Sequence, residues 1–362
     1  MIYIALLFVV CFYLHIATRG EQRLLACKKK SYKRASGFFV SFLILAFFSA
    51  IRDDCGCDYN SYILHIERIQ MGKLTYMEPG FQWVVLFLER YDTNPRFVII
   101  VFAVLTVFFY LLAIWRQSTN KFMSVYIFLT WGYYFITFNT IRNYFALAVV
   151  LCTLPLIIKR KYIWFIIIVL LSATIHKSAV VCIPIYYLAN KITLTKKHIL
   201  PICLFIILLI SLQPLLRSYA FLFYESYEDS VYDTGRISIL NVLKALAVIG
   251  VYVKFRKYLK DDELSKLYFN LNVGALILYL GVFWLPAISR IGFYMNATVM
   301  LFFPRVIESI PSLGKRKEFK IMLYVASFVL FLLLLNQFAA ETNRVLPYKT
   351  WLFGRGYDHY GF

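Results

Sequence analysis

Long apolar runs are the feature that most constrains this chain. They follow one another from residue 2 to residue 339, and hydrophobic residues make up 61% of the 362 positions. A helix needs about 20 mostly apolar residues to cross a bilayer, so these runs and their short charged linkers use nearly the whole sequence. The pattern predicts an all-α polytopic membrane protein, formed by a single integral membrane domain over residues 1–362.

The runs bounded by charges and turn residues predict about twelve transmembrane helices. Their ranges are 2–18, 36–51, 96–115, 122–139, 141–158, 162–175, 177–190, 199–216, 236–254, 267–286, 290–308 and 321–339. A further apolar segment near 81–90 is too short to span, and it predicts a re-entrant or interfacial helix.

The linkers between the runs alternate in charge, and this alternation predicts the topology. One set carries 25 Lys and Arg against 6 Asp and Glu, whereas the other carries 13 of each. The positive-inside rule places the basic set in the cytoplasm. Both termini, the loops 52–95 and 217–236 and the tail 340–362 are therefore expected outside. The net charge of +20 is explained by topology, and a nucleic-acid partner is not expected.

Polar residues that are unusual in an apolar setting fall at the predicted outer ends of the spans. They are Arg52, Asp58, Arg142, His176, Arg236, Arg290, Tyr348 and Lys349. Ionisable groups at bilayer depth are costly, so they usually face a polar cavity or a partner. Several arginines around one outer cavity would suit a diphosphate, because a guanidinium binds phosphate oxygens in a bidentate fork. The alternative for Arg142, Arg236 and Arg290 is that each extends its head into the phosphate layer.

Two residues compete for the role of a general base. His176 is one candidate, because the unperturbed pKa of a histidine side chain lies near neutral pH; a histidine in a tight turn can also serve only as a hydrogen-bonding residue. Asp58 could pair with Arg52 or activate a sugar hydroxyl. Lys244 lies inside a predicted span, where it either pairs with a neighbouring helix or binds phosphate.

Tyrosines are frequent in the predicted outer loops, where they could stack on sugar rings. They are Tyr59, Tyr62, Tyr76, Tyr224, Tyr227, Tyr232 and Tyr348. Cys55 and Cys57 are a close pair, but the sequence has no second pair or His cluster to complete a zinc spacing. No phosphate-binding loop or nucleophile motif occurs either. We therefore expect no metal and no cofactor.

An ordered series of motifs resembles the EpsG-like, Wzy-type polysaccharide polymerases. Arg52 to Tyr62 is similar to their R-x3-G-x-D-Y-x-x-Y stretch. Four further elements occur in similar order, namely Glu78-Pro79-Gly80-Phe81, Ile141-Arg142-Asn143, His176-Lys177-Ser178-Ala179 and Arg290-Ile-Gly-Phe-Tyr294, and Pro347-Tyr348-Lys349 follows them. The sequence departs from the family pattern at Asn143, where glutamine is common, and in its Cys55/Cys57 pair.

The resemblance implies a glycosyltransferase that joins undecaprenyl-diphosphate-linked oligosaccharide units into O-antigen of lipopolysaccharide, capsule or exopolysaccharide. The implied location is the outer face of the bacterial cytoplasmic (inner) membrane, facing the periplasm or exterior, with lipid diphosphate as leaving group. The expected catalytic residues are His176, Asp58, Arg142 and Arg290. The expected substrate-binding residues are Arg52, Tyr59, Tyr62, Arg236, Lys244, Tyr348 and Lys349. Membrane lipids and a chain-length regulator protein are the other implied partners.

Two other functions remain open from the sequence. An O-antigen ligase, or another glycosyltransferase that uses lipid-linked sugars, would share the donor and the outer site. A lipid-linked oligosaccharide flippase or transporter would instead place charges along a path at mid-membrane and show internal repeats. Lys244 is the one cation in the middle of a predicted span, and no repeat is evident.

Overall fold

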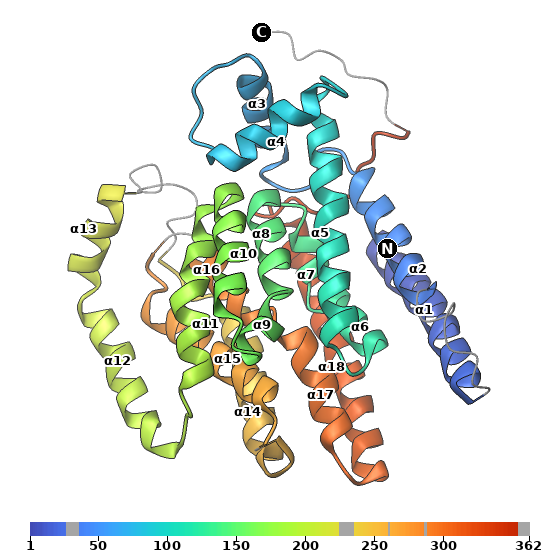
Figure 1. The fold of residues 1–362 in the computed structure, drawn as a ribbon, viewed down its shortest axis with the longest axis vertical. Helices are drawn as coiled ribbons and strands as arrows, with labels where there is room; N and C mark the ends of the chain where they lie inside the picture. The colour runs from blue at the N-terminus through green and yellow to red at the C-terminus, as the bar shows by residue number, and fades with distance from the viewer. Residues whose placement is uncertain (27–35, 224–234, 260, 286–287, 354–362) are drawn as a thin grey trace. The chain divides into compact units, whose positions relative to one another are not determined.

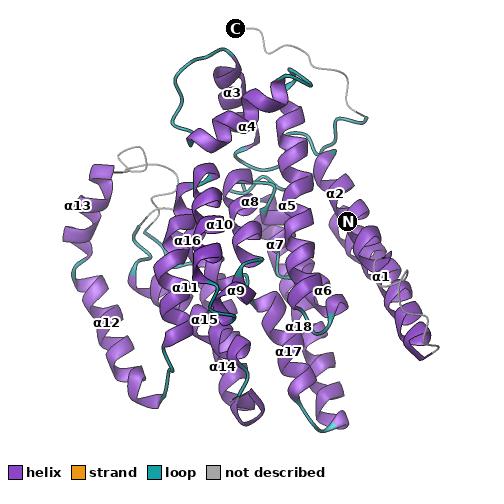
Figure 2. Cartoon of the chain, in the orientation of Figure 1, coloured by secondary structure: helices purple, strands orange, loops and turns teal. Residues whose placement is uncertain are grey.

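The computed structural model describes residues 1–26, 36–223, 235–259, 261–285 and 288–353. Over this part of the chain the secondary structure is helical, joined by loops and turns (Figure 2), with one isolated antiparallel bridge between Arg52 and Thr350. Tyr224, Tyr227 and Tyr232, which the sequence suggested as sugar-stacking residues, lie outside the described residues.

The chain divides into two compact units. The first comprises Met1–Cys152, Thr174–Lys177 and Lys320–Phe362. Its helices (Figure 1) are α1 (Ile2–Ala26), α2 (Ser36–Ala50), α3 (Tyr59–Gln70), α4 (Pro79–Glu89), α5 (Pro95–Gln117), α6 (Lys121–Thr130), α7 (Tyr133–Ile136), α8 (Ile141–Leu151) and most of α18 (Leu313–Ala339).

The second unit comprises Thr153–Ala173 and Ser178–Phe319. Its helices are α9 (Leu154–Ile158), most of α10 (Tyr162–Ile175) and of the 3-10 helix η1 (Lys177–Val181), α11 (Cys182–Lys191), the 3-10 helix η2 (Lys196–His198), α12 (Ile199–Ser211), α13 (Gln213–Phe223), α14 (Ile239–Leu259), α15 (Glu263–Gly281), α16 (Ile288–Asn296) and α17 (Val299–Ser309).

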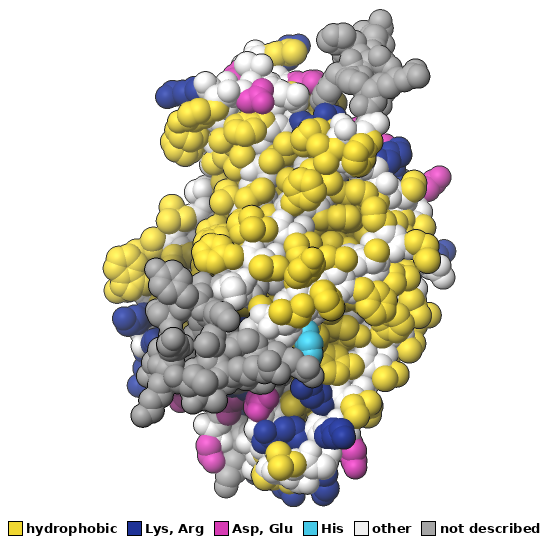
Figure 3. Space-filling view, turned by 90° about the vertical axis from the view of Figure 1, so that its right-hand side faces the viewer, with side chains coloured by type: hydrophobic (Ala, Val, Ile, Leu, Met, Phe, Trp, Pro, Cys, Tyr) yellow, Lys and Arg dark blue, Asp and Glu magenta, His cyan; other side chains and the backbone are white. Residues whose placement is uncertain are grey.

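Helix α2 shows how these sequences suit a lipid environment. Phe39, Leu43 and Phe47 recur every fourth residue and are exposed, whereas Ser41 and Leu45 lie on the opposite, buried side. Residues four apart share one face of a helix, so one side of α2, made mostly of small residues together with Leu45, packs inward, and the large apolar side chains of the other side point outward. The side of the molecule where α1 and α2 lie is largely covered by hydrophobic side chains (Figure 3).

Fewer helices qualify as spans by length and apolar composition than the twelve that the sequence predicted. Among the described residues, three segments qualify: Pro95–Gln117, Ile141–Ile158 and Leu313–Ala339. Lys196–Ser211 and Gln213–Phe221 make a fourth if this pair, bent by 62°, is one broken span. The shorter apolar helices include Ser36–Ala50 and Tyr162–Ile175. The number twelve is not confirmed, and the outer position of both termini stays a prediction.

Several expected spans are interrupted. The run 122–139 breaks at Gly132, whose φ of 82° is in the left-handed region that glycine adopts easily. The run 290–308 breaks between α16 and α17, and the run 141–158 has a turn between α8 and α9, although Ile141–Ile158 still qualifies as one candidate span. Because each break shortens the helix on either side, the apolar run in the sequence is longer than the regular helix that it forms.

Candidate functional site

Glu78 lies at the start of α4, where three segments of the first unit meet. It precedes the helix in an extended conformation, and Pro79 occupies the first helical turn, a position that suits the fixed φ of proline. Gly80 lies against the end of α10, where a Cβ atom would be 2.3 Å from Thr174 Oγ1. Glycine is therefore required for the close approach that brings Glu78 next to His176.

The Glu78 carboxylate binds Arg142 and His176 together. Oε2 forms an ion pair with Arg142 Nη1, and Oε1 lies 3.3 Å from His176 Nδ1. The backbone N–H of Lys177 also donates to Oε1 at 3.0 Å. The side chains of Arg142, Glu78 and His176 are only 8%, 11% and 13% exposed. We call Glu78, Arg142 and His176 the carboxylate cluster; its low exposure strengthens its electrostatic contacts relative to those in water.

Aromatic rings fix the Arg142 guanidinium. Its central carbon lies 5.8 Å from the centre of the Tyr62 ring and 5.4 Å from that of Phe81. Its Nε donates to the Tyr62 hydroxyl at 3.4 Å. Both aromatic side chains are buried. Cation–π contacts of this kind stabilise a guanidinium whose water has been removed, so Arg142 is held by its surroundings and does not extend toward solvent.

The loop 52–58 lies against the segment that precedes Arg142. Gly56 has a φ of 104°, and a Cβ atom there would be 2.3 Å from the Phe138 carbonyl oxygen. The backbone N–H of Cys57 donates to Asn139 Oδ1 at 3.0 Å. The glycine in this motif is therefore needed both for its backbone conformation and for close contact, and the loop ends where α3 begins, at Tyr59.

Arg52 and Asp58 have separate surroundings in this loop. Arg52 is 1% exposed, donates through Nη1 to the Ser49 carbonyl at 2.5 Å, and lies over the Phe138 ring. The Asp58 carbonyl accepts from the Tyr62 N–H, and one carboxylate oxygen of Asp58 lies 3.6 Å from Cys57 Sγ. The hydrogen bonds of the Arg52 guanidinium thus go to Ser49, whereas the sequence suggests Asp58 as its partner.

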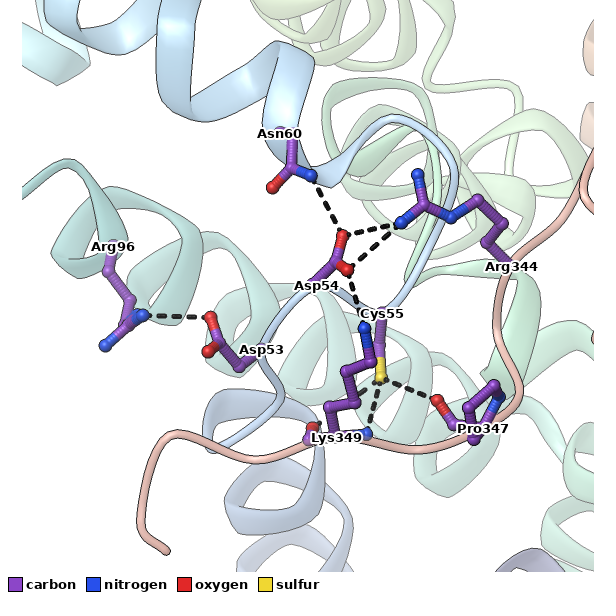
Figure 4. Close-up of polar contacts among 8 residues, drawn as sticks. All are labelled: Asp53, Asp54, Cys55, Asn60, Arg96, Arg344, Pro347 and Lys349. Carbon is purple, nitrogen blue, oxygen red and sulfur yellow. Dashed lines mark hydrogen bonds and ion pairs between the residues drawn. The ribbon is translucent and has the colours of Figure 1, made fainter. Parts of the chain in front are cut away.

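The segment after α18 clamps the same loop (Figure 4). Asp54 forms ion pairs with Arg344 at 3.0 Å and Lys349 at 2.9 Å, and it accepts a hydrogen bond from Asn60. Asp53 pairs with Arg96 at 2.9 Å. The ion pair with Asp54 raises the pKa of Lys349. We call residues 340–353 the C-terminal segment; it fixes the loop that leads to Asp58.

Two more expected substrate contacts have structural partners here. The Tyr348 hydroxyl donates to the Phe48 carbonyl at 2.6 Å, and its ring stacks on Phe48 with centres 4.2 Å apart. Tyr59 is buried near Arg96, whose Nε donates to the Tyr59 hydroxyl at 3.4 Å. Burial raises the pKa of Tyr59 to about 12, so its hydroxyl stays protonated at neutral pH.

The expected site residues are divided between the two units. Arg52, Asp58, Tyr59, Tyr62, Arg142, His176, Tyr348 and Lys349 all belong to the first unit. Arg236, Lys244 and Arg290 belong to the second. There, Arg236 is exposed before α14, Lys244 is buried within α14, and Arg290 lies in α16.

Glu78 is the site residue that sequence reasoning missed. The sequence shows it as part of the Glu78-Pro79-Gly80-Phe81 motif, and that motif alone indicates no role for it. The available signal was a glutamate directly before Pro-Gly at the start of a short apolar segment in a predicted outer loop. Such a carboxylate ends beside a helix N-terminus, where negative charge is stabilised.

Comparison with known proteins supports the resemblance seen in the motifs. The model of the EpsG family matches residues 37–350. No curated protein and no solved structure matches the chain. The matched range covers most of the sequence and includes the loop 52–58, the carboxylate cluster and the Arg290 motif. This chain, whose described residues form helices joined by loops, therefore belongs to the EpsG family.

Proposed function

We propose that this protein is a polysaccharide polymerase of the bacterial cytoplasmic membrane. In the proposed reaction, a hydroxyl oxygen of one lipid-linked oligosaccharide attacks the anomeric carbon of another. The bond from that carbon to the diphosphate oxygen breaks, undecaprenyl diphosphate leaves, and the hydroxyl proton passes to a base. Membership of the EpsG family, which is associated with polysaccharide biosynthesis, supports the reaction class.

The observation that carries this proposal is that one carboxylate holds a candidate base and a candidate anion-binding group. Glu78 Oε1 lies 3.3 Å from His176 Nδ1, and Oε2 pairs with Arg142. A carboxylate beside one ring nitrogen sets the tautomer and orientation of a histidine. We assign His176 as the base, accepting the proton at Nε2, with Glu78 as its positioning residue.

Arg142 is assigned to the diphosphate. A guanidinium has five N–H donors, and the contacts with Glu78 and Tyr62 use Nη1 and Nε. Donors aimed at a leaving group lower the barrier because negative charge develops there in the transition state. Arg290 in the second unit is proposed for the same leaving group.

The other assignments extend this proposal. Asp58 is the alternative base. The residues proposed to bind oligosaccharide or phosphate are Arg52, Tyr59, Tyr62, Arg236, Lys244, Tyr348 and Lys349. The site is proposed to face the outside, where a lipid diphosphate is available as leaving group.

Surface polysaccharide of a deletion strain tests the reaction class. If the protein is a polymerase, the polysaccharide of the deletion strain should consist of a single repeat unit. Expression of the wild-type gene should then restore long chains. Polymer that is made but not attached would point to a ligase, and units retained on the inner side would point to a flippase. Either result would contradict the proposal.

Purified protein with lipid-linked repeat units tests the residue roles. His176→Gln keeps hydrogen-bonding capacity but is a poor base, so we expect polymer to vanish while the lipid-linked unit still binds. Asp58→Asn should retain measurable turnover. Robust turnover by the His176 variant, together with an inactive Asp58 variant, would reverse the two assignments.

A further inference from the structure

Helix α4 has one face that is fully used in packing. Phe81, Val85 and Leu88 recur at intervals of four and three residues and are buried. They belong to one hydrophobic cluster that also includes residues of α3 and the first turns of α5, such as Val98 and Phe102. This spacing places them on a single side of the helix, so the other side of α4 points away from the rest of the first unit.

The outward side of α4 is apolar and aromatic. Trp83 is 67% exposed, Leu86 and Phe87 are also exposed, and Tyr91 is exposed just beyond the end of the helix. The Trp83 and Phe87 rings stack with centres 5.6 Å apart at 12°. An exposed run of large apolar side chains is costly in water, and tryptophan and tyrosine are enriched where protein meets the membrane interface.

Helix α3 provides the contrast. Its exposed residues, at the same spacing of four, are Asn60, Leu64 and Arg68, with Ser61 beside them. Three of these four side chains are polar or charged, which suits water. The two helices pack against each other, so this helical pair has one outward face fit for water and one fit for lipid.

The position of α4 indicates which apolar phase covers it. Residues 90–94 join α4 to α5, which is one of the three candidate spans, and α4 lies across the N-terminal end of α5 (Figure 1). The rings of Phe81 and Phe102 are 5.2 Å apart. Phe102 is within about 10 Å of the start of α5 at 1.5 Å per residue. The packed face of α4 is therefore anchored on the first turns of a candidate span, so α4 lies at the end of that span, the level where a bilayer interface is expected.

We propose that α4 is an interfacial helix whose face of Trp83, Leu86 and Phe87 docks on the lipid bilayer, while the exposed face of α3 stays in water. Because Glu78 begins α4, this docking holds the carboxylate cluster at the level of the lipid phosphates. A lipid-linked diphosphate lies at that level. The docking itself does not depend on the reaction, so it can be tested separately from the proposed function.

Leu86 and Leu64 offer a matched pair for the test. They are the same residue type, are 46% and 44% exposed, and lie on α4 and α3. The variants Leu86→Cys and Leu64→Cys are made in the full-length protein, held as single copies in nanodiscs of phosphatidylethanolamine and phosphatidylglycerol. Both bilayer faces are then open to a charged maleimide. Peptide mass spectrometry reads each position separately, so the native cysteines remain.

We expect the new thiol of Leu64→Cys to react readily and that of Leu86→Cys to react on the order of 10-fold more slowly, because the charged reagent is excluded from lipid. Equal labelling would overturn the proposal. Acyl chains brominated near the headgroup should also quench a component of the fluorescence that is lost in Trp83→Phe. Slow labelling of Leu86→Cys without such quenching would mean that protein covers the face, which would also overturn it.

Discussion

Each compact unit contains a cluster of buried polar side chains, and the two clusters are held together in different ways. In the first unit, carboxylates pair with cations from distant segments, as Glu78 does with Arg142. In the second, neutral amides and hydroxyls bond to each other: Asn296 donates to Asn272 Oδ1 at 2.8 Å, and Asn272 donates to Thr298 Oγ1 at 3.0 Å. All three of these side chains are fully buried.

The ion pairs in the described part of the second unit lie elsewhere. Arg305 pairs with Asp262, and Arg316 with Glu308. Asp262 and Arg316 fall in basic linkers that the sequence predicts to be cytoplasmic, and Arg305 and Glu308 lie at the adjoining end of the predicted span 290–308. Neutral hydrogen bonds are enough to fix helix packing, whereas buried charges have a high desolvation cost. The charged cluster of the first unit is therefore better explained by chemistry than by stability.

The largest effect is expected for Glu78→Gln, with Glu308→Gln as its counterpart in the second unit. Loss of the Glu78 charge removes the group that orients His176 and leaves Arg142 without its counter-charge. Polymerisation with purified lipid-linked units should fall by about 100-fold or more. Glu308 is 42% exposed, so its variant should keep wild-type turnover. Equal rates in the two variants would remove the distinction between the units.

Gly80→Ala is expected to lower turnover, whereas Gly250→Ala is expected to leave the stability unchanged or to raise it. A Cβ at Gly80 would overlap Thr174 and displace the start of α4, whereas a Cβ at Gly250 in α14 meets nothing within 4 Å. We expect about a 10-fold loss of turnover in the first variant, because small displacements of catalytic groups are costly. The second should unfold at the same or a higher temperature, since alanine favours a helix by roughly 0.5–1 kcal/mol. Unchanged turnover in Gly80→Ala would show that α4 does not set the geometry.

A smaller effect is expected for the loop contacts. Asp54 has three partners (Arg344, Lys349 and Asn60), whereas Asp53 has an ion pair with Arg96. Partly exposed pairs contribute about 0.2–1 kcal/mol each, so Asp54→Asn should lower the unfolding temperature more than Asp53→Asn does. An equal or reversed order would argue against a clamp by the C-terminal segment.

The same comparison has a pH dependence. The ion pair raises the pKa of Lys349, so its contribution is present in full below the ordinary lysine pKa of 10.5 and is lost as pH rises through the raised value. The difference in unfolding temperature between wild type and Asp54→Asn should therefore be constant near neutral pH and become smaller only in strong alkali.

The sequence predicted the helices better than the site. Each apolar run became helical because its composition satisfies both helix formation and lipid exposure. The breaks, such as the one at Gly132, escaped prediction because they depend on close contacts: a Cβ there would meet the Phe338 and Leu334 side chains. Helix α3 was also not predicted. Polar residues on its outward face interrupt the sequence, so it contains no long apolar run.

The site was predicted residue by residue but not as an assembly. Arg142 and His176 were recognised from their positions at predicted outer ends of spans. Their joint partner was not, because Glu78 and Arg142 are 64 residues apart and no local pattern records which distant side chains meet. Membership of the EpsG family supports the motif order, whereas the grouping around one carboxylate comes from the structure.

A double-mutant cycle of Glu78→Gln and His176→Gln, measured as polymerisation of purified lipid-linked repeat units, tests the central claim most directly. If Glu78 acts through His176, the effects are not additive, and the double variant should be about as impaired as the more impaired single variant. Binding of the lipid-linked unit, measured in parallel, should persist in His176→Gln. Losses that multiply would show that the two side chains act independently and would contradict the account.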